Sequence, residues 1–410
     1  MSVPLAAGPW PAVEALAAIG GWWGAMPLNR KRFERALLNV RQAFPTWTDA
    51  QVQRCGQASY EHIFRLAAEF LYIPRLINED NWPSHLEIPV GLRQRPNAQA
   101  QAQMVHQTQL FPANIEIATG TNADPKVDIT MPLDEAAGAG PALDILLSRR
   151  RCILLTGHCG NWELLAYIIA AVGFPMHAVY RPLDNPALDQ WVRSTRGRRG
   201  VTLLDKFGAA NRINEVLAEG HPLAFVADQN AGDRGLFVPY FGRLTSTYKA
   251  IGLLAIKHNA PVMCAAARRL KGPEAWRDGG GFRYRMEVTD VIEPDAWKNH
   301  PDPLFYITAR YRRALEQMVR KAPEQYLWMH RMWKSRPRHE RDGKPVPKAQ
   351  IEKLRTLPWM TAAEIDRVID DSERSAVEFA REAKARTTPE TKPGAKLSSK
   401  AEAQAEPGED

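Results

Sequence analysis

Between residues 140 and 290, short apolar runs alternate with segments that have the spacing of helices. We expect strands at residues 152–155, 177–179, 201–204, 223–226, 262–267 and 284–288. We expect helices at residues 163–172, 185–195, 209–217, 248–258 and 305–321. Parallel strands need a crossover connection, usually a helix, so this alternation is typical of parallel sheets. The sequence therefore predicts an α/β fold with a largely parallel central sheet flanked by helices.

The segments outside this alternating region differ in composition. Residues 30–75 place apolar side chains at helical spacings, and Pro45 separates two expected N-terminal helices. Residues 92–139 are rich in Pro, Asn, Gln and Gly, which predicts an irregular insertion with candidate edge strands near 114–118 and 127–131. We therefore divide the chain into an N-terminal segment at 1–29, a main domain at 30–345, a helical extension at 346–386 and a disordered C-terminal tail at 387–410.

The charge balance is basic, because 54 Lys and Arg residues face 46 Asp and Glu residues, which gives a net charge of +8. The basic residues cluster at 30–32, 149–151, 193–199, 310–313 and 331–341. Such clusters suit nucleic acid, anionic lipid headgroups or an acidic carrier protein, although any single cluster can be an ordinary solvated face. Nucleic acid is disfavoured, because no recognition helix, zinc finger or RNA-binding aromatic pattern accompanies them.

The cysteines indicate a reducing compartment. Cys55, Cys152, Cys159 and Cys264 show neither paired metal-ligand spacing nor a disulfide framework. Cys159 is expected to be a small packing residue rather than a nucleophile. The sequence contains no HExxH, P-loop, GxGxxG or G-x-S-x-G motif, so metalloprotease, nucleotide-triphosphatase, dinucleotide-binding and nucleophile-elbow functions lack support.

Residues 13–28, VEALAAIGGWWGAMPL, form the most apolar segment near the start of the chain. The segment falls short of the roughly 18–20 apolar residues that a membrane-spanning helix needs. Two tryptophans beside the basic run Arg30-Lys31-Arg32 are typical of an anchor in the membrane interface. The alternative is an amphipathic helix that packs on the domain. We predict that residues 1–29 form a membrane-associated helix.

The expected strand at 152–155 runs into the expected helix at 163–172 through a turn that contains His158. Gly157 and Gly160 allow the backbone to turn sharply, and Asn161 is a candidate N-cap of the helix. Glu163 lies in the first turn of this helix. The loop before the helix can fold the imidazole of His158 back over the Glu163 carboxylate. An imidazole oriented by a carboxylate is a general base for a bound alcohol. The alternative is a core histidine and a capping glutamate that never meet.

Polar residues also follow two other expected strands, and open α/β sheets build their sites at such strand ends. Arg181 can bind a phosphate through its planar guanidinium. Asp228 can orient Arg181 or contact an acceptor hydroxyl, and the alternative is a buried Asp–Arg pair that only ties the strand ends together. Gln229 and Asn161 can be substrate contacts or merely loop and capping residues. Arg331 is a candidate contact for headgroup phosphates.

The stretch TGHCGNWE at residues 156–163 resembles the H-x4-D/E signature of the lysophospholipid/glycerolipid acyltransferase superfamily, and in particular its lipid A biosynthesis late acyltransferases (lauroyl and myristoyl transferases). Further blocks agree in order along the chain, namely LNVRQAFP at 38–45, YRPLDNP at 180–186, ADQN at 227–230, VPYFG at 238–242 and YLWMHRMWKSRP at 326–337. The resemblance runs from about residue 12 to 338. It departs from the family in the long segment 92–139 and at Met332, where the family usually has a basic residue.

The resemblance implies an O-acyltransferase of glycerolipid acyltransferase-like fold on the cytoplasmic face of a bacterial inner membrane. Its acyl donor would be an acyl thioester on acyl carrier protein or acyl-CoA, and its acceptor a hydroxyl of a glycolipid such as a lipid A precursor. His158 and Glu163 would be catalytic, and no metal or bound cofactor is required. The implied substrate-binding residues are Asn161, Arg181, Asn185, Asp228, Gln229 and Arg331. Two other functions remain open, a thioesterase or lipid hydrolase with the same dyad and a non-enzymatic basic lipid-binding protein.

Overall fold

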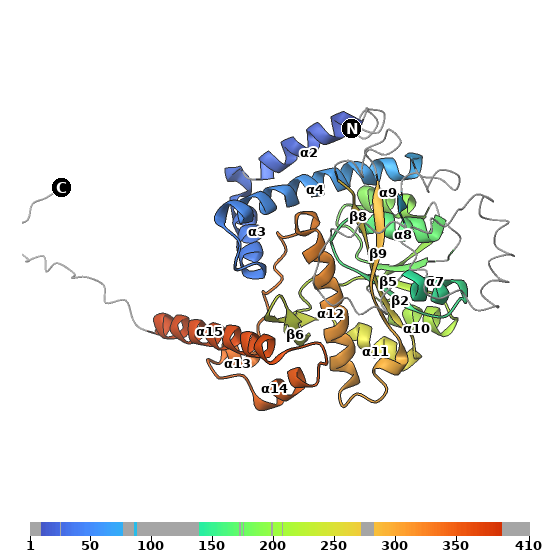
Figure 1. Ribbon diagram of the computed structural model, residues 1–410. Coiled ribbons are helices and arrows are strands. Elements are labelled where there is room, and N and C mark those ends of the chain that lie inside the picture. The colour runs from blue at the N-terminus through green and yellow to red at the C-terminus, as the bar shows by residue number, and fades with distance from the viewer. Residues whose placement is uncertain are drawn as a thin grey trace, which may run out of the picture.

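The computed structural model describes residues 10–24, 26–76, 86–87, 139–171, 174, 176–197, 200–206, 208–271 and 283–387. A seven-stranded sheet in the order β1-β9-β8-β2-β5-β3-β4 lies at its centre (Figure 1). The strands are β1 (Leu86–Glu87), β2 (Ile153–Thr156), β3 (Met176–Tyr180), β4 (Val201–Asp205), β5 (Leu223–Val226), β8 (Val262–Arg269) and β9 (Tyr284–Ile292). Strands β8, β2, β5, β3 and β4 pair in parallel, and β9 runs antiparallel to β8. The predicted α/β fold with a largely parallel sheet is therefore confirmed.

Helices on both faces explain why the central strands are apolar throughout. All four residues of β2 are buried. Ile153 and Leu155 belong to a core formed with helices α10 (Ala210–Ala218), α11 (Lys249–His258) and α12 (Pro303–Lys321). Leu154 points to the opposite face and packs with α7 (Ala139–Leu147) and α8 (Trp162–Ala171). Successive side chains of a strand alternate between faces, so a strand covered on both sides becomes a continuous apolar run.

The helices at 163–172, 185–195, 209–217, 248–258 and 305–321 are confirmed as α8, α9 (Pro186–Gly197), α10, α11 and α12. The hairpin of β6 (Leu236–Tyr240) and β7 (Arg243–Thr247) was not predicted. Its two-residue turn, Phe241-Gly242, has positive φ at both positions, as type I′ turns require. Phe241 is a poor residue for such a turn, so the sequence carried a weak hairpin signal. The hairpin packs against α12.

Three N-terminal helices form a layer along one side of the molecule (Figure 1). They are α2 (Trp10–Gly24), α3 (Arg30–Ala43) and α4 (Asp49–Leu76), with the 3-10 turn η1 (Pro27–Asn29) between α2 and α3. Helix α2 lies so close to α4 that a Cβ at Gly20 or Gly24 would overlap Phe64 or Tyr60. The predicted pair of helices at 30–75 is confirmed. None of the helices that the structure describes has both the length and the apolar character needed to cross a membrane.

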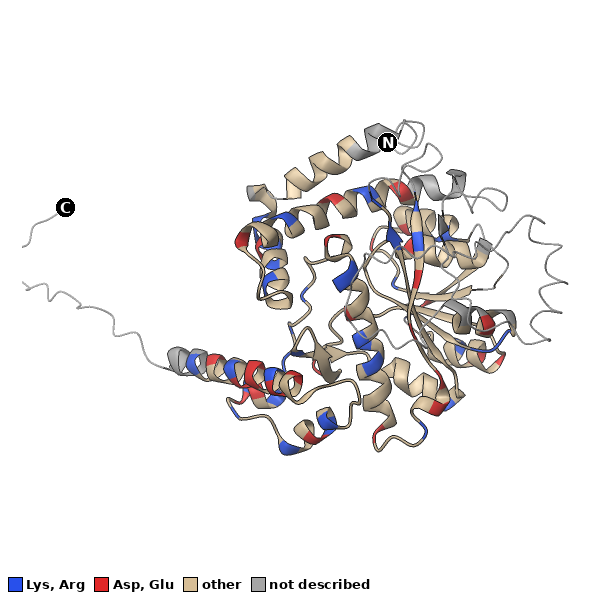
Figure 2. Ribbon diagram, viewed as in Figure 1, with Lys and Arg blue, Asp and Glu red and all other residues tan. Residues whose placement is uncertain are grey.

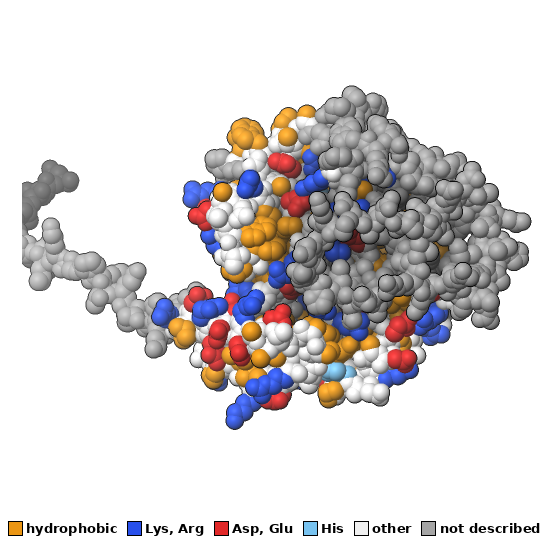
Figure 3. Space-filling model, in the orientation of Figure 1, with side chains coloured by type: hydrophobic (Ala, Val, Ile, Leu, Met, Phe, Trp, Pro, Cys, Tyr) orange, Lys and Arg blue, Asp and Glu red, His pale blue; other side chains and the backbone are white. Residues whose placement is uncertain are grey.

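The opposite face of α2 carries exposed apolar side chains. Ile19 and Trp22 are 59% and 61% exposed, and Leu16 and Trp23 are also exposed. Figure 2 shows no charged residue on α2 over residues 15–24, whereas α3 beside it carries several. In Figure 3 the same helix appears as a group of hydrophobic side chains along the upper edge. Helix α2 thus packs on the domain and still presents an apolar face. Its association with a membrane stays a prediction.

The C-terminal helices are α13 (Arg338–Arg341), α14 (Lys348–Arg355) and α15 (Ala362–Thr387), and the remaining 3-10 turns are η3 (Pro294–Ala296) and η4 (Pro323–Gln325). Helix α15 is held by Arg243 of β7, whose Nε lies 3.0 Å from Asp371 Oδ2. The helices at 348–355 and 362–387 occupy the predicted C-terminal extension. The predicted insertion at 92–139, apart from residue 139, and the predicted tail beyond residue 387 lie outside the described residues.

Candidate active site

His158 and Asp228 meet at the carboxyl ends of two neighbouring parallel strands. Strands β2 and β5 pair in a register that sets Thr156 opposite Val226, so each site residue comes two positions after its strand. His158 Nδ1 lies 2.7 Å from Asp228 Oδ1, and the His158 backbone N–H donates to Asp228 Oδ2 at 2.9 Å. The Asp228 side chain is buried and the His158 side chain is 18% exposed. The contact has the geometry of the carboxylate–imidazole half of a catalytic triad.

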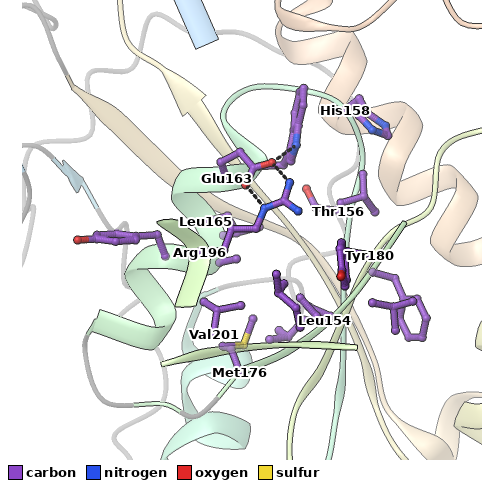
Figure 4. A pocket seen from close by; sticks show the side chains of 18 of the residues that line it. Leu154, Thr156, His158, Glu163, Leu165, Met176, Tyr180, Arg196 and Val201 are labelled. Carbon is purple, nitrogen blue, oxygen red and sulfur yellow. Dashed lines mark hydrogen bonds and ion pairs between the residues drawn. The ribbon is translucent and has the colours of Figure 1, made fainter. Parts of the chain in front are cut away.

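The partner of His158 differs from the sequence prediction. Glu163 was expected to orient the imidazole, but its carboxylate accepts hydrogen bonds from Arg196 at 2.6 and 2.8 Å and from Trp162 Nε1 at 3.1 Å (Figure 4). Asp228 makes the orienting contact, although it is 70 residues away in sequence. The sequence pattern could not show this, because the pairing depends on the adjacency of β2 and β5 in the sheet.

The predicted link between Asp228 and Arg181 is also replaced. Arg181 is 65% exposed and lies 3.9 Å from Asp184, at the surface. The arginine beside Asp228 is Arg312 of α12, whose Nη1 donates to the Asp228 carbonyl oxygen at 2.6 Å. Arg312 is fully buried, and its guanidinium lies 3.8 Å from the centre of the Tyr240 ring. A buried Asp–Arg contact therefore exists, with a partner that sequence analysis did not name.

The charges around His158 favour its protonated form. Burial by itself would lower the pKa of His158, but the charge and hydrogen bond of Asp228 and the more distant charge of Glu163 raise it above the ordinary value. Burial would raise the pKa of Asp228, yet His158 and the buried Arg312 hold the pKa of that carboxyl well below its usual range. Asp228 therefore stays ionised and stabilises the imidazolium that a general base becomes when it accepts a proton.

The loop that carries His158 is fixed by backbone and side-chain contacts. Gly160 has φ +63°, and a Cβ there would overlap the carbonyl oxygen of Ala267 in β8. The next residue, Asn161, donates its backbone N–H to that carbonyl at 2.7 Å. The predicted N-cap is confirmed, since Asn161 Oδ1 accepts from Leu164 N–H at 2.9 Å. Asn161 Nδ2 donates to Glu69 of α4 at 2.8 Å, so the Asn161 side chain, predicted to bind substrate, is buried with both polar ends engaged.

A cavity of about 600 Å³ opens beside His158 and runs between helices α8 and α9 and the sheet. Figure 4 shows His158 and the Glu163–Arg196 pair at one end, and Leu154, Met176 and Val201 at the other. The lining beyond the polar end is apolar and includes Ala166, Ile169, Ala178, Leu203 and Ala224. The volume lies within the range of small-molecule sites, and the form suits a chain with a polar head and a hydrocarbon tail.

A second histidine, His330, lines the same cavity. Its ring centre lies 5.2 Å from that of His158, and its Nε2 lies 3.1 Å from Nε2 of Gln229. Burial, and then the charge of His158, lower the pKa of His330 to about 4. In the sequence, His330 stands out only as part of the block at 326–337 and has no predicted role. It was missed because only the fold brings residues 158 and 330 together.

The other predicted site residues lie as follows. Asn185 Oδ1 accepts from Leu188 N–H at 3.1 Å and so caps α9. Arg181 and Gln229 line the cavity, and Arg331 is exposed. Cys159 is buried with its Sγ 3.5 Å from the Met318 carbonyl oxygen, which confirms it as a packing residue. Within the described residues, no group of three or more His, Cys, Asp or Glu side chains could hold a metal ion.

The segment that forms most of this site is similar in sequence to known proteins. Residues 142–335, which include β2 to β9, α8 to α12 and both histidines of the cavity, match the family described as bacterial lipid A biosynthesis acyltransferase. This match covers just under half of the chain. The resemblance to lipid A biosynthesis late acyltransferases that the sequence blocks indicated is therefore confirmed.

Individual lipid A acyltransferases match over similar segments. The Escherichia coli lipid A biosynthesis lauroyltransferase is 28% identical over 206 residues, which cover 50% of this chain and 62% of the relative. The E. coli palmitoleoyltransferase is 30% identical over 167 residues, covering 40% and 49%. A Haemophilus influenzae lipid A biosynthesis acyltransferase is 30% identical over 193 residues, covering 45% and 56%. The chain thus spans about half to three fifths of the length of these relatives.

Proposed function

We propose that this protein is an O-acyltransferase that moves a fatty acyl chain from an acyl thioester to a hydroxyl of a glycolipid of the lipid A type. The observation that carries the proposal is the His158–Asp228 pair at the polar end of an apolar cavity. A base at the head of a hydrocarbon-binding cavity is the arrangement that acyl transfer requires. The match of residues 142–335 to the lipid A acyltransferase family supports the same chemistry.

In this proposal His158 is the general base. Asp228 engages Nδ1, which leaves Nε2 to take the proton of the acceptor hydroxyl as its oxygen attacks the thioester carbonyl. Asp228 fixes the ring and stabilises the imidazolium. The imidazolium then returns the proton to the thiolate that leaves. The substrate supplies the nucleophile, so no serine or cysteine of the protein has to form an acyl-enzyme.

The apolar part of the cavity takes the acyl chain of the donor. Its lining residues come from α8, α9 and strands β2 to β5, so the hydrocarbon would be held against the sheet with its thioester near His158. Burial of the chain contributes about 0.8 kcal/mol for each methylene group removed from water. Filling the cavity with hydrocarbon also displaces water, which favours transfer to a hydroxyl over hydrolysis.

Arginines at the polar end suit anionic substrate groups. Glu163 holds Arg196 in a two-point ion pair, and Arg181 stands exposed at the cavity wall. A guanidinium binds phosphate through two parallel hydrogen bonds. We assign Glu163 a supporting catalytic role, because its charge raises the pKa of His158 and its carboxylate positions Arg196. Arg181, Gln229 and Arg331 remain the proposed substrate contacts.

We assign the protein to the cytoplasmic face of a bacterial inner membrane, where α2 would rest its apolar face in the lipid interface. Trp22 and Ile19 lie on that face, and Arg30, Lys31 and Arg32 follow at the start of α3. The donor would be acyl carrier protein or acyl-CoA. An acidic carrier would find complementary charge in a chain of net charge +8.

The test is transfer by purified protein in lipid vesicles that contain a lipid A precursor, with radiolabelled acyl carrier protein or acyl-CoA as donor. We expect labelled glycolipid, and we expect His158→Ala to lose at least about 10²-fold of the rate while its unfolding temperature stays near that of the wild type. His221→Ala, a surface histidine beside Glu219, is the control and should retain activity. Release of free fatty acid without labelled glycolipid would make the protein a hydrolase. Absence of both products would favour a lipid-binding protein.

A further inference from the structure

Two consecutive residues after β5 each contact one of the two histidines in the cavity. Asp228 contacts His158 through Oδ1 at 2.7 Å, and Gln229 contacts His330 through Nε2 at 3.1 Å. The two imidazole ring centres lie 5.2 Å apart, with their planes tilted by 57°. The two partners differ in kind, because Asp228 is an anion and Gln229 is a neutral amide. His158 is therefore placed to carry positive charge, and His330 is not.

The backbone that carries His330 is clamped by the N-terminal helices. Asn39 of α3 donates from Nδ2 to the carbonyl oxygens of Trp328 and His330 at 2.6 and 2.7 Å. Ser59 of α4 donates to the Tyr326 carbonyl oxygen at 2.5 Å. Asn39 and Ser59 lie outside the segment that matches the family, and Asn39 belongs to the block LNVRQAFP. The position of His330 is thus fixed from both sides, by these helices through its backbone and by Gln229 through its ring.

The surroundings of His330 keep its ring neutral. The titratable groups that act on it are His158, whose charge opposes a second positive charge nearby, and Asp228, whose opposite effect is smaller. With Gln229 Nε2 as the donor, Nε2 of His330 accepts, and the ring proton resides on Nδ1. His330 then offers one N–H donor that the Gln229 contact leaves free.

We propose that His330 is a second catalytic histidine, which donates a hydrogen bond to the carbonyl oxygen of the acyl thioester as that oxygen becomes an oxyanion. This inference rests on the proposed acyl transfer. The acceptor oxygen forms its bond to the carbonyl carbon and gives its proton to His158 Nε2. The C=O π electrons move onto oxygen, which the His330 N–H stabilises. When the C=O bond re-forms, the C–S bond breaks and the thiolate takes the proton from His158. His330 ends the cycle unchanged.

A neutral donor suits this role better than a charged one in this cavity. Two imidazolium rings 5.2 Å apart would repel each other, and a protonated His330 would oppose the protonation of His158 that the reaction needs. A neutral N–H stabilises the oxyanion without that conflict. The division of labour between the two histidines therefore follows from the carboxylate at residue 228 and the amide at residue 229.

The experiment compares His330→Leu with His330→Gln in the transfer assay. Leucine removes the donor, and we expect kcat to fall about 10²- to 10³-fold. Glutamine carries an amide N–H of similar reach, and we expect it to recover at least about tenfold of that loss. KM, and the affinity for an unreactive thioether analogue of the donor, should stay within about twofold, because the oxyanion does not exist in the ground state. His339→Gln is the matched control, since His339 contacts Ser372 of α15 and does not line the cavity.

The outcomes separate this inference from the proposed function. If His158→Ala abolishes transfer while His330→Leu keeps kcat within about threefold of the wild type, the inference alone fails. A loss that appears only in KM or in analogue binding would also overturn it, because His330 would then be a ground-state contact. Should both His330 variants unfold, Gln229→Leu keeps the histidine and removes the amide that contacts its ring. An unchanged kcat in that variant would count against the proposal.

If the wild-type protein forms free fatty acid but no labelled glycolipid, transfer as the proposed function fails. The same comparison of His330 variants then applies to thioester hydrolysis, which passes through the same oxyanion. The inference survives in that case only if His330→Leu slows hydrolysis and His330→Gln restores part of it. A wild-type protein with neither activity would overturn both proposals.

Discussion

His158 and its two neighbouring carboxylates illustrate how residue types take different roles through their contacts. Asp228 hydrogen-bonds the ring and the backbone of His158, whereas Glu163 is engaged by Arg196 and acts on His158 through its charge. Both carboxylates raise the pKa of His158, but only the contact with Asp228 also sets the orientation of the ring. Replacing each carboxylate by its amide should therefore give different losses.

We predict that Asp228→Asn lowers kcat by about 10²- to 10⁴-fold and changes the pH profile. A general base must be deprotonated, so the activity of the wild type should rise with pH, with a midpoint above the ordinary histidine value of 6.5. Without Asp228 the lowering effect of burial is less opposed, and the midpoint should move to lower pH. The measurement is kcat/KM between pH 5 and 9, a range about two units around that value. An unshifted midpoint would show that Asp228 does not act on His158.

Glu163→Gln provides the comparison within the same site. This variant loses a charge that raises the pKa of His158. We expect kcat/KM to fall about tenfold, and the midpoint of the pH profile to move to lower pH by less than in Asp228→Asn. Both amide variants should be assayed with the same donor and acceptor. A loss at Glu163 equal to that at Asp228 would return Glu163 to the orienting role that the sequence pattern predicted.

At the scale of elements, helix α2 packs against α4 with one face and exposes apolar side chains on the other. Its glycines let it approach α4, and its exposed residues form an apolar strip without charged neighbours on the helix between residues 15 and 24. We predict that replacing Ile19 and Trp22 together by serine releases the protein from vesicles that contain anionic lipid. Each exposed apolar side chain withdrawn from water would contribute about 1.5–3 kcal/mol to binding. Flotation of the vesicles measures the bound fraction.

The matched control replaces Leu253 and Ile256, which are exposed on α11, by serine. This double variant should remain bound, since it also removes two exposed apolar side chains but leaves the α2 face intact. Equal retention of both double variants would place the membrane contact on another surface.

The cavity is likewise formed by elements, because α8 and α9 cover one face of the strands. Val201 at the start of β4 lies at its apolar end. We predict that Val201→Phe shortens the cavity, so that kcat/KM falls about tenfold or more for long acyl donors and little for short ones. Overpacking should cost about 1–3 kcal/mol of stability. Assays with a series of chain lengths test this, and Val377→Phe on the exposed face of α15 is the control. A uniform loss at every chain length would argue against an acyl chain in this cavity.

At the scale of the whole molecule, helix α4 is joined to the sheet by a buried polar cluster. Glu69 of α4 forms an ion pair with Arg269 of β8, accepts from Tyr284 of β9 and accepts from Asn161 Nδ2 at 2.8 Å. His62 of the same helix contacts the Gly160 carbonyl oxygen at 3.1 Å. The loop of His158 is therefore held by a helix that lies outside the family-matched segment.

We predict that Glu69→Gln lowers the free energy of unfolding by about 3–5 kcal/mol, because it removes the negative charge from a buried ion pair with Arg269. Glu34→Gln breaks an exposed pair with Arg30 and should cost less than about 1 kcal/mol. Urea unfolding followed by far-UV circular dichroism measures both variants. Equal stability of the two would mean that the buried cluster does not join α4 to the sheet as tightly as its contacts suggest.

The sequence by itself determined the parts of this protein that depend on local order. The apolar run at residues 152–155 is recognisable because burial on both faces makes a strand apolar throughout. The helix at 249–258 is recognisable because burial on one face spaces its apolar residues at a helical period. The glycine-flanked turn at His158 and the N-cap at Asn161 were recognisable because each depends on residues that are close together in the sequence. The resemblance to the acyltransferase family followed from several blocks in a fixed order.

The tertiary structure decided which of these residues act together. Asp228 became the partner of His158 because β5 pairs with β2, and His330 entered the cavity because α3 and α4 hold its segment. Glu163, five positions from His158 in the sequence, forms its ion pair with Arg196 of α9. Sequence patterns report the periodicity of one segment at a time. A catalytic pair is defined by distances of about 3 Å between side chains of different elements, and only strand pairing and helix packing set those distances.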